Sequence, residues 1–152
     1  MLQLSFDELD DQNGVPLGAT DWIEVSQSDI DSFARITRDA QWIHVDPDRA
    51  AQGPFGRTIA HGYLTLSYAS HFLEELLHVD GATNVVNYGV NRVRFPAPVP
   101  SQAKLRGRGE LLDVESKGAA RHARIAMTIE IENGDRPACV AEVLVRYARD
   151  EG

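Results

Sequence analysis

The sequence contains one cysteine, Cys139, in 152 residues, which excludes an intramolecular disulfide and favours a reducing compartment. Lysine is almost as scarce, because only Lys104 and Lys117 among the fifteen basic residues are lysine. No apolar run approaches the length of a membrane span, and the first residues lack the basic and apolar regions of a signal peptide. The formal net charge of −8 disfavours nucleic acid or an anionic membrane as the main partner. These absences predict a cytoplasmic protein that binds neither nucleic acid nor a membrane.

An apolar fraction of 43% is typical of an ordinary globular protein. A chain of 152 residues is long enough to bury one core and short for two, so we expect one domain over residues 1–152. Neither an internal repeat nor a low-complexity segment is present. Cys139 lies in an alternating pattern, which favours a small core residue over a reactive thiol.

Local signals predict two short helices in the first half of the chain. Ser26 and Asp29 have the spacing of a capping box, and an apolar stripe at helical spacing follows, ending near Asp39. Asp46 and Pro47 resemble an N-cap and the first helical residue of one or two turns that end near residue 52. The segment 17–25 that precedes both helices is predicted to be extended.

A longer helix is predicted from Gly62 through His78, with Gly81 as its C-terminal stop. Its apolar residues occupy nearly the whole circumference, which is typical of a buried helix. The rest of the chain is predicted to be β. Residues 85–95 are rich in valine, and apolar and polar residues alternate over 103–111, 122–132 and 139–147, with a hairpin signal at 133–134. Such alternation indicates an antiparallel sheet with one buried face. We therefore predict an α+β fold in which one buried helix lies against a curved antiparallel sheet.

Asp39 precedes His44 by five residues, a spacing that no regular element explains. Five residues advance about 140° around a helix, so the two side chains would diverge. On a strand, an odd separation places them on opposite faces. Only a chain reversal brings this acid and this base together, as acid–base catalysis requires.

These features resemble a hotdog fold, and residues 37–62 resemble the hydratase motif of the MaoC-like family. That family comprises (R)-specific enoyl-CoA hydratases and related 3-hydroxyacyl-thioester dehydratases. The matching positions are Asp39, Ile43, His44 and Ala50, whereas Arg38, Gln41 and Trp42 replace a Gly, an Asn and a Pro of the family pattern. Residues 56–62 resemble the family's segment leading into the hotdog helix, and 91–99 resemble its third strand and the following turn. The likeness spans nearly the whole chain and is closest to the single-hotdog subgroup that includes nodulation-protein-N-like dehydratases.

The resemblance implies reversible addition of water to a trans-2-enoyl-CoA, with Asp39 and His44 holding the water between them. It implies that the backbone N–H of Gly62 stabilises the charge on the thioester oxygen. It also implies four substrate-binding residues: Gln41, Ala60, His61 and Arg94. The expected substrate is an acyl-CoA or acyl-carrier thioester, and the expected assembly is a homodimer with each site near the subunit boundary. Neither a cofactor nor a metal ion is required.

Other interpretations of these residues stay open. Asp39 is also compatible with a helix-capping role, His44 with a hydrogen-bonded core histidine, and His61 with a structural role. A metal site of these three residues is conceivable by residue type, but it lacks H-x-x-x-H or cysteine spacing. The alternative functions are a hotdog thioesterase, which would release free CoA thiol, and a non-catalytic acyl-thioester binding module.

Overall fold

Alternating side chains build one six-stranded sheet in the computed structural model, which describes residues 1–149. All its strand pairs are antiparallel, in the order β2-β6-β7-β8-β5, with β3 also paired to β6. The strands are β2 (Val15–Ala19), β3 (Ile23–Glu24), β5 (Asn84–Arg94), β6 (Lys104–Lys117), β7 (Ala120–Ile131) and β8 (Cys139–Ala148). Buried residues alternate with half-buried ones along β8, and its first residue, Cys139, is 1% exposed. The predicted sheet and the core position of Cys139 are confirmed.

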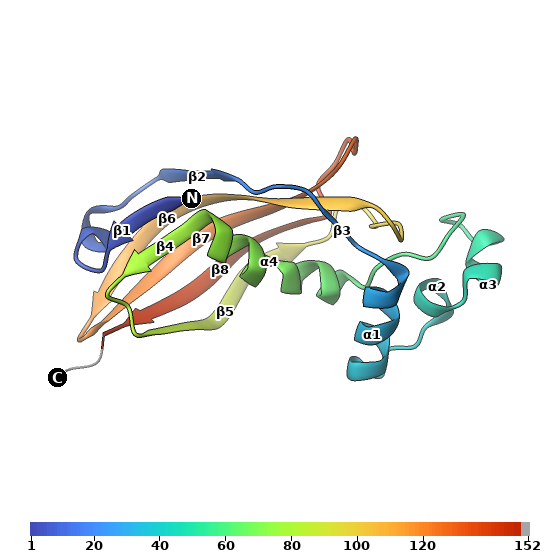
Figure 1. Ribbon diagram of the computed structural model, residues 1–152, viewed down its shortest axis with the longest axis horizontal. Coiled ribbons are helices and arrows are strands. Elements are labelled where there is room, and N and C mark those ends of the chain that lie inside the picture. The colour runs from blue at the N-terminus through green and yellow to red at the C-terminus, as the bar shows by residue number, and fades with distance from the viewer. Residues whose placement is uncertain (150–152) are drawn as a thin grey trace.

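Helix α4 (Gly62–Leu76) lies along the sheet, which curves around it (Figure 1). Its buried residues include Leu64, Phe72 and Leu76, and the helix approaches β6 closely at Gly107. A Cβ atom at Gly107 would lie 2.4 Å from the Cβ of Phe72, so this contact requires glycine. A curved antiparallel sheet around one helix is the α+β hotdog arrangement, as predicted. Contrary to the prediction of burial on most faces, Tyr63 is 71% exposed in the single chain.

The predicted end of this helix is wrong by two residues. The helix ends at Leu76, and Leu77 takes extended dihedral angles of −136° and 122°. Strand β4 (Leu77–Asp80) then pairs in parallel with β1 (Leu2–Ser5), a strand the sequence analysis does not predict. Leu77 and Val79 are buried while His78 and Asp80 are exposed, so the alternation at the strand period decides the structure here. The 3₁₀ helix η1 (Glu8–Asp11) follows β1.

Three short helices form what we call the helical lobe (residues 27–51): α1 (Gln27–Thr37), α2 (Trp42–Val45) and α3 (Pro47–Ala51). The lobe lies beyond one end of the sheet (Figure 1). The capping box is confirmed, since Ser26 Oγ accepts from the Asp29 N–H and an Asp29 carboxylate oxygen accepts from the Ser26 N–H. The Asp46 side chain caps α3 through the Arg49 N–H, with Pro47 at the start, again as predicted.

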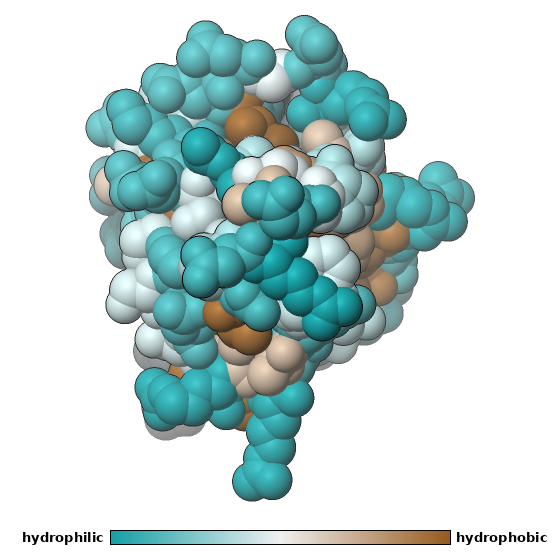
Figure 2. Space-filling model, turned by 90° about the vertical axis from the view of Figure 1, so that its right-hand side faces the viewer, coloured by the Kyte–Doolittle hydropathy of each residue, from teal (hydrophilic) through white to brown (hydrophobic). Residues whose placement is uncertain are grey.

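Viewed from the lobe end, the surface is mostly hydrophilic with small hydrophobic areas between polar side chains (Figure 2). Among residues 1–149, the structure contains no helix long and apolar enough to span a membrane.

Candidate active site

Asp39 occupies a turn between the first two helices of the lobe. Helix α1 ends at Thr37, and Arg38 takes the left-handed conformation with a φ of 63°. This residue reverses the chain, so that Asp39 lies in the connection that leads into α2. The reversal brings a carboxylate oxygen of Asp39 and one ring nitrogen each of His44 and His61 within 4.8 Å of one another. The structure therefore brings the predicted acid and base together.

His44 lies in α2 and is buried, with 6% of its surface exposed. Its Nδ1 is 2.7 Å from the carbonyl oxygen of Ile59. Because a carbonyl oxygen only accepts, Nδ1 carries a proton, and in the neutral ring Nε2 keeps its lone pair. That tautomer leaves Nε2 able to accept a proton from a bound water molecule.

Burial lowers the pKa of His44. The hydrogen bond to Ile59 raises this pKa, the neighbouring His61 lowers it, and the Asp39 carboxylate raises it, with a net shift downward. His44 is therefore neutral near pH 7, which is the state a general base needs.

The segment that precedes α4 holds His44 through its backbone. The Ile59 N–H donates to the Ile43 carbonyl at 3.0 Å, so Ile59 contacts α2 with both backbone groups. The Ala60 N–H donates to the Val99 carbonyl at 2.8 Å and fixes the same segment to the rest of the fold. This clamp explains how a ring in a helix of four residues keeps a defined orientation.

Gln27, the first residue of α1, supports the site from the other side. Its side-chain amide donates to the His44 carbonyl at 2.8 Å and its Oε1 accepts from the Thr58 hydroxyl. Sequence reasoning misses Gln27 and the Ile59 carbonyl, because no local spacing links either of them to His44.

His61 is the N-cap residue of α4 and is 2% exposed. Its ring stacks on that of His44, with 3.8 Å between ring centroids and 24° between the planes. Its Nε2 is 2.9 Å from the carbonyl oxygen of Asp39, to which it donates. Among residues 1–149, no hydrogen-bond partner faces its Nδ1.

The cluster of Asp39, His44 and His61 has ligand types that suit a metal ion, but its geometry does not. Two of the four ring nitrogens already face backbone carbonyls. A ring nitrogen binds a metal in the plane of its ring, and two nearly parallel stacked rings cannot both direct a lone pair at one ion. The arrangement fits hydrogen-bonding and proton transfer better than coordination.

A cavity of about 340 Å³ adjoins His44 and the start of α4, and Ala60, Gly62 and Phe95 also line it. Gly62 is the first residue of the helix, where N–H groups have no intrahelical acceptor and the helix dipole favours negative charge. A Cβ at Gly62 would lie 3.1 Å from the Phe95 ring, which shows how closely that ring covers the backbone.

The remaining predicted substrate-binding residues lie outside this cavity lining. Gln41 is exposed at the start of α2, and His61 is buried beneath His44. Arg94 is exposed at the end of β5, beside Phe95, and one of its guanidinium nitrogens donates to the Val93 carbonyl at 2.7 Å. Phe95, which sequence reasoning does not single out, contacts the predicted oxyanion site instead.

Comparisons with known proteins place this geometry in context. Solved structures with the same fold include the unliganded R-hydratase PhaJ1 from Pseudomonas aeruginosa, with a TM-score of 0.75 and 22% identity over 91% of this chain and 83% of that one. At this identity the likeness concerns the fold. The 3-hydroxyacyl-thioester dehydratase Z of Mycobacterium tuberculosis is 46% identical over 88% of this chain and 89% of its own length.

Nodulation protein N of Rhizobium leguminosarum bv. viciae is 43% identical over 93% of this chain and 89% of its own length. Residues 10–133 match the profile of the MaoC like domain, and they include the whole helical lobe and α4. With this match and these relatives, the chain belongs to the MaoC-like domain family.

Proposed function

We propose that this chain, as one domain over residues 1–152, is a hydro-lyase that adds water reversibly to trans-2-enoyl-CoA to give the (R)-3-hydroxyacyl-CoA. The proposal rests mainly on the close approach, within 4.8 Å, of a His44 ring nitrogen and an Asp39 carboxylate oxygen beside the N-terminus of α4. The dehydratase names of the 46% identical relatives support the reaction class. A cytoplasmic location stays a prediction.

The dyad would hold one water molecule between the Asp39 carboxylate and Nε2 of His44. The water oxygen attacks C3 of the enoyl group while the dyad takes one of its protons. A proton returned by the dyad reaches C2, so that H and OH add across the double bond and nothing is consumed besides water. We assign no separate proton donor and acceptor within the dyad.

Negative charge develops on the thioester oxygen during this addition. The N–H of Gly62 would stabilise that charge, supported by the dipole of the fifteen-residue helix α4. The cavity beside Gly62 and His44 offers room for the reacting group. Its lining is largely apolar, and an electrostatic interaction is stronger beside apolar side chains than in bulk water.

Three of the four predicted residues would bind the rest of the substrate. Ala60 lines the reaction cavity, and Gln41 precedes the helix that carries His44. Arg94 has an exposed guanidinium group that suits a phosphate of CoA or of an acyl carrier. For His61, whose ring lies beneath His44, substrate contact stays a prediction.

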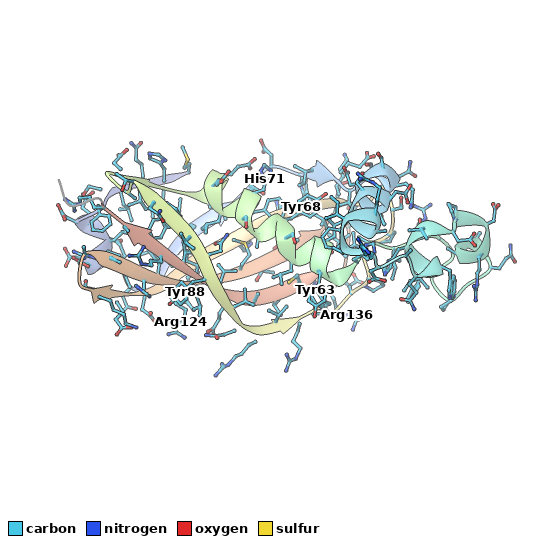
Figure 3. The ribbon with its side chains drawn as sticks, turned by 90° about the horizontal axis from the view of Figure 1, so that it is seen from below. Tyr63, Tyr68, His71, Tyr88, Arg124 and Arg136 are labelled. Atoms are coloured by element: carbon cyan, nitrogen blue, oxygen red, sulfur yellow. The ribbon has the colours of Figure 1, made fainter. Side chains whose placement is uncertain are left out.

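Strand β5 supports the proposal of a homodimer. Within residues 1–149 it pairs with β8 alone, and its free side is the edge of the sheet (Figure 3). Large apolar side chains are exposed along it: Val85, Val86, Tyr88 and Val90. An exposed edge with such side chains is an aggregation hazard unless another strand covers it. Pairing with β5 of a second copy would remove the hazard and bring two subunits together near Phe95.

Light scattering on the purified protein tests this assembly. We expect twice the mass of the chain for the wild type and a shift to monomer for Val86→Asp, which places a charge on the pairing edge. Ile36→Asp is the matched control, because Ile36 is an exposed apolar residue on α1, away from β5. A wild-type monomer would refute the proposed dimer.

Hydration of crotonyl-CoA tests the activity through loss of the ultraviolet absorbance of the conjugated thioester. Asp39→Asn and His44→Ala should abolish the loss, whereas Asp48→Asn and His78→Ala should retain it as matched exposed controls. The product should be the (R) alcohol, which an (S)-specific dehydrogenase leaves unoxidised. Release of free CoA thiol would instead support a thioesterase. Binding without turnover on short and long chains would support a binding module.

A further inference from the structure

His61 differs from the usual N-cap residue in what its side chain does. An N-cap Ser, Thr, Asp or Asn accepts a hydrogen bond from its own helix. The His61 side chain makes no such bond to α4, although its dihedral angles of −61° and 141° are those of an N-cap. Its Nε2 donates instead to the Asp39 carbonyl, 22 residues earlier in the chain. The residue therefore ties the start of α4 to the turn that carries Asp39.

The same ring covers one face of His44. The centroids of the two rings are 3.8 Å apart, and the ring planes are 24° from parallel. Phe33 of α1 packs against His61, with 5.0 Å between the ring centroids. His44 thus has its edge fixed by Ile59 and one face fixed by His61. Its Nε2 is the part of the ring that these contacts leave for the cavity.

Helix α4 begins with the residue after His61, so the ring and the N–H of Gly62 belong to consecutive residues. A shift of His61 would change the positions of Asp39, His44 and Gly62 relative to one another. We propose that His61 is a positioning residue, which holds both members of the dyad and the oxyanion donor in one arrangement. This role rests on the proposed hydratase function, and it replaces substrate contact as the role that the contacts of His61 support best.

The charged and titratable groups that face His44 are Asp39 from the turn and His61 from the start of α4. The Ile59 carbonyl contacts His44 without a charge of its own, and Phe33 from α1 packs against His61. Because His61 lowers the pKa of His44, its replacement by an uncharged ring should raise that pKa. A residue that merely fills space would leave the titration of His44 where it is.

Two substitutions separate the contacts of His61. His61→Phe keeps a flat ring against His44 but removes the donor to Asp39. His61→Gln can keep that donor but removes the stacked ring. Misplacement of catalytic groups by about 1 Å costs ~10²-fold in rate, so we expect kcat to fall by that order in His61→Phe while KM changes little. His61→Gln should recover part of the loss if the hold on Asp39 contributes.

The experiment combines the pH profile of crotonyl-CoA hydration with an NMR titration of His44 in the wild type, both variants and the control His78→Phe. We expect the acid limb of kcat/KM and the His44 titration to move together to higher pH in His61→Phe, and neither to move in the control. An unchanged His44 titration and unchanged kcat in both variants would overturn the positioning role. The titration requires no turnover, so an inactive wild type would refute the hydratase function and leave the positioning role to the NMR result. Circular dichroism confirms folding, and His61→Gln carries the test if His61→Phe does not fold.

Discussion

Replacing Gly62 with proline would remove a hydrogen-bond donor on which the proposed chemistry depends, the backbone N–H of residue 62. Proline is well tolerated at the first residue of a helix, and Gly62 holds that position in α4. The residue before a proline must be extended, and His61 already has dihedral angles of −61° and 141°. The helix should therefore form in Gly62→Pro. Gly62→Ala is the matched control, because both substitutions add a Cβ about 3.1 Å from the Phe95 ring and only proline removes the donor.

Loss of one oxyanion donor costs about 10²–10³ in kcat, or ~2.7–4 kcal/mol of transition-state stabilisation. The Phe95 side chain is 41% exposed, so it can move away from the Cβ that either substitution adds at residue 62. The alanine variant should therefore lose far less activity than the proline variant. Initial rates of crotonyl-CoA hydration at saturating substrate measure the difference, with thermal unfolding as the check on folding. A folded proline variant as active as the alanine variant would refute the assignment of the Gly62 N–H.

Three further predictions concern His44 and the core. Burial lowers the pKa of His44 from its ordinary value of 6.5, so the acid limb of the wild-type kcat/KM profile should lie below pH 6.5, and a limb above it would contradict the role of His44. Folding stability should also decrease below pH 6.5, where the unfolded chain binds a proton that folded His44 does not. Gly107→Ala, whose Cβ would lie 2.4 Å from Phe72, should destabilise the fold by about 1–3 kcal/mol and lower Tm by ~2–12 °C. Gly89→Ala is its control, because a Cβ there would meet only the Leu144 side chain, with its Cδ1 methyl nearest at 3.2 Å. Equal unfolding temperatures would show that α4 can move away from the sheet.

Features determined by neighbouring residues could be predicted from the sequence. The capping box at Ser26 and Asp29 needs only a three-residue spacing, and the N-cap at Asp46 needs only the proline that follows. The alternation over β7 and β8 likewise reports which face of the sheet is buried. The approach of Asp39 to His44 could be predicted because neither a helix nor a strand would bring residues five apart together. The left-handed Arg38 supplies the required chain reversal.

Features that depend on distant contacts could not be predicted. The apolar pattern of the helix continues past Leu76, although the helix itself ends there. Pairing of Leu77 with Leu2, near the start of the sequence, favours an extended chain instead. The hydrogen bond from His44 to Ile59 joins residues fifteen positions apart, a separation that no sequence pattern indicates. Nor does composition indicate that His61 would stack on His44, because both residues lie in separate apolar segments.

The position of the helical lobe has a consequence for local unfolding. Among the helices and strands, the lobe's three helices contact chiefly one another and α4 contacts the sheet, while residues 58–61 join the lobe to α4. We therefore expect Asp39 and His44 to belong to a part of the chain that opens while the strands stay paired, and Gly62 to belong to the part that resists. Amide hydrogens in α2 should exchange with solvent well before those in β7, and heating should abolish turnover below the temperature at which the sheet melts. Activity would then report the docking of two cooperative units against each other rather than the stability of either one.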